Sequence, residues 1–178
     1  MHMVVTVILE ILKFTIPALI VFLTVYHMFK KHTQSLYQQK ALELKAEIAK
    51  QTLPVKLQAY ERLLLFCERI DIHHMYYRLN TPNMKSRELM QSMLITVQQE
   101  YEYNMAQQLY VSTSLWKIIS LAKEQILLVI SQTGELTNPD DSSHTLFERI
   151  NVLISQMKTN PLEQAKEAIK KEVDALLV

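Results

Sequence analysis

The chain has 178 residues, a formal net charge of +1 and one cysteine. A charge this close to neutral creates no strong field toward nucleic acid, so no nucleic-acid partner is predicted. Gly134 is the only glycine, which excludes the glycine-rich loops that bind phosphates and dinucleotides and disfavours tight hairpins. Because Cys67 is alone, no intramolecular disulfide or cysteine cluster for zinc can form. These limits favour an all-α protein.

The first element is the apolar run from Val4 to Lys31. No charged residue lies between Phe14 and Phe29, and as a helix that stretch spans roughly 24 Å. Extension back to Val4 gives enough length to cross a hydrocarbon core of about 30 Å, and it includes Glu10 and Lys13, which can pair at i and i+3. A buried core helix and a cleaved signal peptide are the alternatives. Residues 19–29 are hydrophobic on all sides, and Lys30 and Lys31 follow them, so residues 1–31 are predicted to be one transmembrane anchor.

The lysines predict the orientation of this anchor. Basic residues are concentrated after the run, at Lys30, Lys31, Lys40, Lys45 and Lys50. Because the positive side of a membrane helix stays in the cytoplasm, the N-terminus is predicted outside and the main body inside. An unpaired Cys67 fits a reducing compartment.

Residues 32–53 are predicted to continue the anchor as a juxtamembrane helix, since they lack glycine and proline. Apolar residues recur there at the spacing of a coiled-coil seam, namely Tyr37, Ala41, Leu44 and Ile48. Three interpretations are open for this heptad stripe: packing on the chain's own downstream helices, self-association, or binding of a different protein.

Residues 54–178 are predicted to form a bundle, giving five to six helices in the body. Pro54 is expected to end the juxtamembrane helix and start a new one to about Ile70. Asp71 can cap a short following turn of sequence IHHMYYRL, which precedes a loop at residues 80–83.

Four more helices are predicted from capping residues and apolar periodicity. The first runs from an N-cap at Ser86 to about Leu109, and the second from Ser112 or Ser114 to a left-handed C-cap at Gly134. The third begins with a capping box at Thr145 and ends near Lys158, and the fourth begins at Asn160. The inward faces of the first two contain Met90, Met93, Val97, Tyr101 and Met105, and Leu115, Ile119, Ala122, Ile126 and Ile130.

Two polar clusters contain side chains of the types that bind metals or catalyse reactions. Cys67, Glu68, Asp71, His73 and His74 contain three types of metal ligand, but their spacing matches no standard metal motif. Glu100, Glu102 and Asn104 alternate with tyrosines, which an exposed helix face explains without catalysis. No catalytic residue, metal or cofactor is therefore predicted, and the protein is not expected to be an enzyme.

Methionines are dense in the middle third, where core packing or a groove for a partner helix would explain them. Met90 and Met93 are included among the candidate interaction residues, together with the heptad stripe.

The runs LPVKLQAYERLLLFCERI, HHMYYRLNTP and QEYEYNMAQQLYVSTSLWKIISLAKEQI resemble an uncharacterised family of short bacterial proteins. That resemblance implies one N-terminal membrane helix and a helical cytoplasmic body, at a bacterial inner (plasma) membrane. It implies no activity. The layout also resembles the membrane-anchored b-type peripheral stalk of rotary ATP synthases, from which this chain is expected to depart at Pro54.

The favoured hypothesis is a membrane-anchored helical adaptor or accessory subunit that holds a protein partner at the cytoplasmic face of the bilayer. The alternatives are a metal-dependent membrane-bound enzyme or sensor that uses the Cys67–His74 cluster, and a homo-oligomeric spacer built on the heptad stripe.

Overall fold

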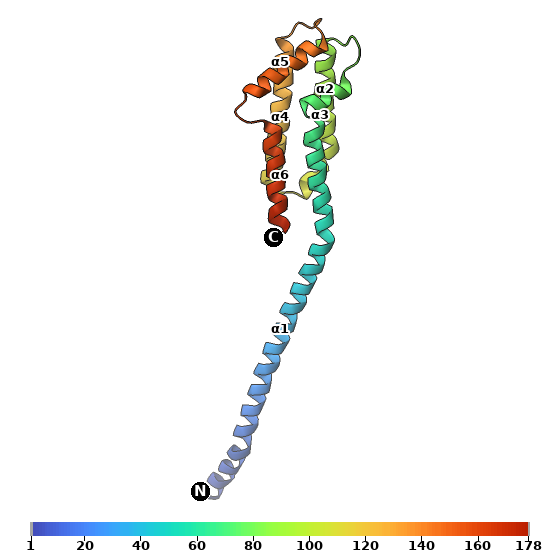
Figure 1. The fold of residues 1–178 in the computed structure, drawn as a ribbon. Coiled ribbons are helices and arrows are strands. Elements are labelled where there is room, and N and C mark those ends of the chain that lie inside the picture. Colours follow the sequence, from blue (N-terminus) through green and yellow to red (C-terminus); the bar gives the residue numbers. More distant parts are fainter. Residues whose placement is uncertain (1, 178) are drawn as a thin grey trace. The chain divides into compact units, whose positions relative to one another are not determined.

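A computed structural model describes the backbone of residues 2–177 and the side chains of residue 13 and residues 15–177. These residues form helices and no strand, as the all-α prediction requires (Figure 1). In chain order the elements are α1 (His2–Arg69), α2 (Ile72–Leu79), α3 (Ser86–Asn104), the 3-10 helix η1 (Met105–Leu109), α4 (Thr113–Glu135), α5 (Ser143–Gln156) and α6 (Pro161–Leu177).

Contacts divide the chain into two compact units, Met1–Thr52 and Leu53–Val178. The first, which we call the N-terminal unit, consists of the first part of α1. The second, which we call the bundle, contains the end of α1 and all later helices.

The predicted helix break at Pro54 is wrong, because α1 is continuous through Leu53 and Pro54. A proline inside a helix removes one backbone hydrogen bond and costs about 3 kcal/mol. From Ala59 onward α1 buries side chains in the bundle core, and this packing outweighs the local penalty. Close to the proline, the Thr52 hydroxyl donates to the carbonyl oxygen of Ile48 at 2.9 Å. A single helix therefore replaces the two that were predicted on either side of Pro54, and residues 32–53 are part of it, continuous with the residues before them.

The apolar side chains of residues 15–29, which we call the apolar segment, are exposed on all sides of α1. Phe22 is 65% exposed and Phe29 is 67% exposed. The N-terminal part of the predicted membrane span, residues 4–12 and 14, lies outside the described side chains. In the described part of the chain, no helix contains a stretch long and apolar enough to cross a membrane.

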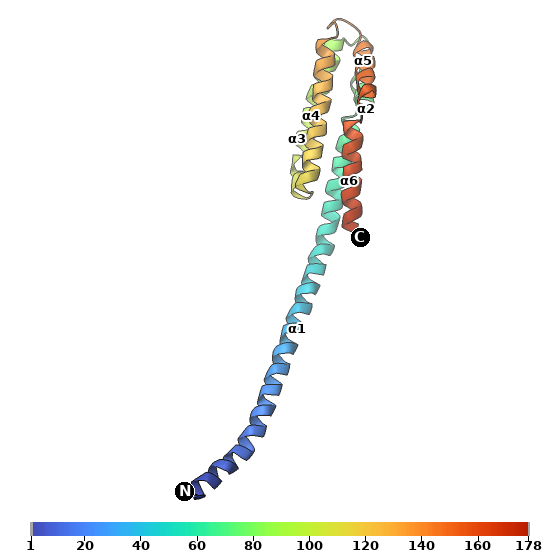
Figure 2. The same ribbon diagram turned by 90° about the vertical axis from the view of Figure 1, so that its left-hand side faces the viewer.

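In the bundle, α4 is the central helix and packs against α3, α5 and α6 (Figure 2). The predicted inward face of α4 is confirmed, because Leu115, Ile119, Ala122, Ile126 and Ile130 are all buried. They meet Leu63 and Phe66 from α1, and Ile70 just after it, in one core. Leu89 and Phe147 are also buried there, although neither was included in the predicted faces.

Capping residues explain most helix ends in the bundle. Asp71 accepts from the backbone N–H groups of His73 and His74, as predicted, and of the two serines predicted to start α4 it is Ser112 whose hydroxyl accepts from Leu115 N–H. Ser86 is not an N-cap, because it is the first residue of α3 and its hydroxyl donates to the carbonyl oxygen of Ser142. Ser142, and not Thr145, caps α5. The helix expected to reach Leu109 ends at Asn104 and continues as η1.

Gly134 is not a left-handed C-cap, because it lies inside α4 without a positive φ angle. Instead it lets Met90 of α3 approach the α4 backbone. A Cβ atom at position 134 would clash with Met90 Sδ and lie 2.8 Å from Met90 Cγ. The glycine therefore leaves room for the Met90 side chain between two helices and is not part of a turn.

Candidate functional site

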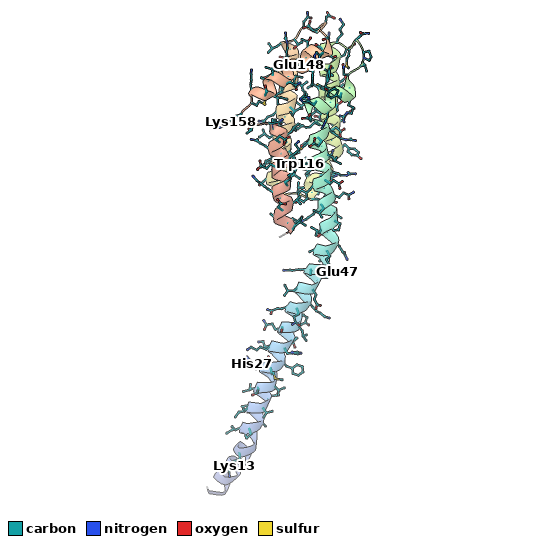
Figure 3. All side chains as sticks on the ribbon, viewed as in Figure 1. Lys13, His27, Glu47, Trp116, Glu148 and Lys158 are labelled. Carbon is teal, nitrogen blue, oxygen red and sulfur yellow. The ribbon has the colours of Figure 1, made fainter. Side chains whose placement is uncertain are left out.

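The heptad stripe in the N-terminal unit is fully exposed. Tyr37 is 73% exposed, Leu44 is 62% exposed and Ile48 is 53% exposed, and Ala41 lies between them. Side chains project outward along this part of α1, as Glu47 does in Figure 3. Apolar side chains at seam spacing with this exposure can accept a partner helix.

The two methionines among the predicted interaction residues have a different environment. Met93 is fully buried and is a core residue, so it is not available to a partner at the surface. Met90 is half-buried against Gly134. Both side chains fill the interior between α3 and its neighbours, which is the packing interpretation of the methionine-rich stretch.

The Cys67–His74 cluster is dispersed by the fold. Asp71 caps α2, His73 is exposed with its ring 5.2 Å from that of Phe147, and His74 Nδ1 lies 2.8 Å from the carbonyl oxygen of Glu68. Within the described residues, no group of three or more His, Cys, Asp or Glu side chains is placed to hold a metal ion.

Cys67 is 1% exposed, and burial raises the pKa of its thiol to about 12. The approach of Lys166 acts in the opposite direction and offsets only part of that shift. Because the thiolate is the reactive form, this cysteine is kept protonated and inert at neutral pH.

Glu100 and Asn104 of the second predicted cluster line a groove of about 530 Å³ between the end of α1 and α3. Arg69 Nη1 donates to both carboxylate oxygens of Glu100, at 3.0 and 3.2 Å. The guanidinium of Arg62 lies 5.6 Å from the centre of the Tyr103 ring. Glu102 is not part of this groove, because it is exposed and accepts a hydrogen bond from Gln98. The charged groups of the α1–α3 groove thus have partners within it.

A third polar cluster joins three helices at the start of α4. Glu172 Oε2 accepts from the Ser112 hydroxyl at 2.5 Å, and Glu172 Oε1 accepts from Ser112 N–H at 2.8 Å and from the Tyr60 hydroxyl at 2.9 Å. Burial disfavours the carboxylate, but these hydrogen bonds outweigh burial and lower the pKa of Glu172. Burial, followed by the hydrogen bond to Glu172, raises the pKa of Tyr60 to about 12. Ser112 therefore has a structural role at an N-cap.

An exposed apolar stripe lies on α4 and its C-cap. Ile118 is 38% exposed, Leu121 is 55% exposed, Leu128 is 54% exposed and Leu136 is 81% exposed. At 100° per residue these four positions fall within about 80° of one another on the helix, so they share one face. We call them the α4 stripe.

Two grooves adjoin the α4 stripe on the side of α5. One, of about 550 Å³, is lined by Leu136 together with Arg149, Val152 and Leu153. The other, of about 360 Å³, is lined by Leu128, Leu153 and Met157. Gln132 and Leu153 line both grooves, and we call the two together the α4–α5 groove. Its lining combines apolar side chains with polar ones, which suits an amphipathic helix.

The α4 stripe was not identified from the sequence. The available signal was Leu128, which lies outside the inward face of α4 and has a leucine seven residues before it. A helix with apolar residues outside the face that packs on the core has a second apolar face. That second face is either covered by a partner or exposed to solvent. The burial of Leu115 and the exposure of Leu121 and Leu128 show which of the two leucine-containing faces of α4 points inward.

The fold defines an all-α protein in which a helical bundle follows a long helical N-terminal unit. The chain belongs to DUF7935, a family of unknown function, whose match covers residues 6–176. No curated protein and no solved structure is significantly similar to it. The predicted resemblance to an uncharacterised family is thereby confirmed, and family membership supplies no activity.

Proposed function

We propose that this protein is a membrane-anchored helical adaptor that holds a protein partner at the cytoplasmic face of a bacterial inner membrane. The observation that carries the proposal is the α4 stripe, where Leu121, Leu128 and Leu136 are each more than half exposed beside an apolar groove. Exposed apolar side chains that share one helix face beside a groove are typical of interaction sites in folded proteins.

The partner segment proposed for the α4–α5 groove is an amphipathic helix. Apolar positions three and seven residues apart on α4 match the spacing at which a helix presents anchors to another helix. Gln125 and Gln132 lie between the leucines on the same face and line the groove. Their amides can hydrogen-bond to a partner and restrict its register.

Anchoring is proposed for the apolar segment together with the residues that precede it. Large side chains are exposed all around this part of α1, and a helix that is apolar on every side is stable only when apolar material surrounds it. The run from Val4 to Phe29 is long enough to span a bilayer. The lysines at its end support an orientation with the bundle in the cytoplasm.

Extraction of membranes with alkaline carbonate tests the anchor. The full chain is expected to remain with the membrane pellet, and protease added to inverted vesicles is expected to digest the bundle. Release of the chain by carbonate contradicts the anchor, and protection of the bundle in inverted vesicles contradicts the orientation.

Purification from native membranes in mild detergent tests the adaptor role. A stoichiometric protein partner is expected with the wild-type chain and is expected to be lost from the Leu121→Lys/Leu128→Lys variant, whose changed side chains are exposed. The matched control is Ile95→Lys/Leu177→Lys, because Ile95 is 57% exposed and Leu177 is 60% exposed away from the α4 stripe. Bare wild-type monomers, or equal loss of the partner from both variants, would exclude this role for the α4 stripe.

The exposed heptad stripe supports a second candidate, a homo-oligomeric spacer. If Tyr37 and Leu44 occupy d positions, Lys40 is a g position and Lys45 the following e position. In a parallel pair these two lysines would face each other across the interface, and like charges there are unfavourable. The charges thus favour a different helix over a second copy. Leu44→Asp tests this candidate, since it would dissociate a homo-oligomer and leave a monomer unchanged in size.

A further inference from the structure

The end of the apolar segment combines aromatic and basic side chains in a way the adaptor role does not explain. Tyr26 is 58% exposed and Phe29 is 67% exposed, and Lys30 and Lys31 follow them directly. His27 belongs to the same turn and projects from α1 (Figure 3). Rings of this kind favour the boundary between hydrocarbon and headgroups.

These lysines have no acidic neighbours in the sequence. No aspartate or glutamate occurs between Glu10 and Glu43, whereas Lys45 and Lys50 alternate with Glu43 and Glu47. In the bundle, Lys171 lies 2.8 Å from Glu167, and Lys166 lies 3.0 Å from Glu68. Among the described residues, no ion pair involves Lys30 or Lys31. Two adjacent positive charges thus stand unneutralised beside an apolar surface.

We propose that Lys30 and Lys31 bind the headgroups of anionic phospholipids while Tyr26 and Phe29 lie at the edge of the hydrocarbon. The proposal rests on the membrane anchor proposed above and adds the lipid class that surrounds it. A lysine ammonium is a compact charge on a flexible stem, so both lysines can reach phosphates from a helix that stands in the bilayer. The site is a surface that selects among neighbouring lipids, and it requires no pocket.

The expected strength follows from the number of charges. Each lysine close to an anionic membrane surface favours association by about fivefold, so the pair favours anionic over neutral lipid by up to about 25-fold at low salt. Salt at 1 M shortens the Debye length to about 3 Å and is expected to remove most of this preference. Lys40 is about 15 Å further along the helix from Lys30, beyond the Debye length at physiological salt.

Fluorescence quenching by brominated lipids tests the proposal with the full chain in vesicles. The reporter is the double variant Tyr26→Trp/Trp116→Phe, which leaves one tryptophan, next to the lysines. Vesicles contain phosphatidylcholine and phosphatidylglycerol, and either one or the other carries bromine on its acyl chains. Quenching is compared in the reporter chain, in the same chain with Lys30→Gln/Lys31→Gln, and in a control with Lys170→Gln/Lys171→Gln. The control pair is also adjacent and exposed, but it lies in α6.

Stronger quenching by brominated phosphatidylglycerol is expected in the reporter and control chains, with equal quenching by both lipids after Lys30→Gln/Lys31→Gln. Equal quenching by both lipids in the reporter chain overturns the lipid preference and leaves the membrane anchor intact. A preference that survives Lys30→Gln/Lys31→Gln overturns the assignment to these lysines. Absence of quenching by either lipid shows that position 26 is not in a bilayer, and the anchor and the lipid site then fail together.

Discussion

Two stretches of α1 are both rich in large apolar side chains, and their environments are opposite. In residues 59–70, Leu63 and Phe66 are buried in the bundle core, while Glu61, Arg62 and Arg69 lie on the outer side. In residues 15–29, apolar side chains point in every direction and all are exposed. The two stretches differ because only the one that packs in the bundle has charged side chains at helical spacing along one face.

This contrast shows what an apolar composition can and cannot determine. A helix with one polar face can bury the other face against a few neighbouring helices, as the end of α1 does. A helix without a polar face would leave apolar surface in water in any such arrangement. Its stable environment must be apolar on all sides, which is the physical reason for proposing lipid around the apolar segment.

The most direct test of this contrast is to replace one phenylalanine by alanine in each stretch. Phe66→Ala is expected to lower the free energy of unfolding of the bundle by about 3 to 5 kcal/mol, because it leaves a cavity at a side chain that is 1% exposed. Phe22→Ala, at a side chain that is 65% exposed, is expected to change it by less than about 0.5 kcal/mol. Urea unfolding followed by Trp116 fluorescence measures both. A comparable loss in the two variants would mean that the apolar segment packs on protein.

A second test concerns how closely the bundle is packed. Gly134→Ala favours the helix by about 1 kcal/mol but places a methyl group against Met90, where overpacking costs about 1 to 3 kcal/mol. We expect a net loss of stability in the wild-type background and a gain of about 1 kcal/mol in a Met90→Ala background. The same urea experiment on the four chains of this double-mutant cycle gives the coupling free energy between positions 90 and 134. Identical effects in both backgrounds would contradict the close contact between α3 and α4.

A third test uses pH to examine the contact between Tyr60 of α1 and Glu172 of α6. The pKa of Tyr60 is raised to about 12 from its usual value of 10.0, mainly by burial and then by Glu172. An acid with a raised folded-state pKa holds its proton more tightly when folded, so its contribution to stability is complete below pH 10 and is lost as the pH rises through about 12. Unfolding free energies measured from pH 9 to 12 should therefore fall less steeply for Tyr60→Phe than for the wild type. The buried Cys67 thiol adds a loss of the same sign in both chains. An unchanged slope would show that the Tyr60 hydroxyl does not lose its environment on unfolding.

Much of the bundle could be predicted because its signals are local. The caps at Asp71, Ser112 and Asn160 follow from side-chain oxygens at fixed offsets, and Asn160 Oδ1 does accept from Leu162 N–H at 2.9 Å. The buried face of α4 follows from its 3.6-residue period. Pro54 and Gly134 were misinterpreted for one reason: their usual local roles were outweighed by helix packing that no local pattern contains.

The candidate site was less predictable than the fold. Exposure of the heptad stripe agrees with an interaction surface, but its role stays a prediction, as does the membrane anchor. Met93 is predicted to contact a partner, but it lies in the core. The sequence does not distinguish the two cases, because a stripe of methionines can be covered either by the protein's own core or by a partner. The α4 stripe became visible only when burial separated two apolar faces of one helix.

The smallest expected effect in the bundle is at the start of α5, where the sequence predicts Thr145 as the N-cap and the structure has Ser142. The Ser142 hydroxyl accepts from Thr145 N–H at 3.4 Å, and Ser143 N–H donates to the carbonyl oxygen of Met84 at 2.9 Å, which fixes the turn before the helix. Ser142→Ala is expected to cost about 1 kcal/mol of unfolding free energy, within the usual range for an N-cap. Thr145→Ala is expected to cost less, because position 145 is inside the helix, where alanine is the better helix former. A larger loss for Thr145→Ala in urea unfolding would return the cap to the position predicted from the sequence.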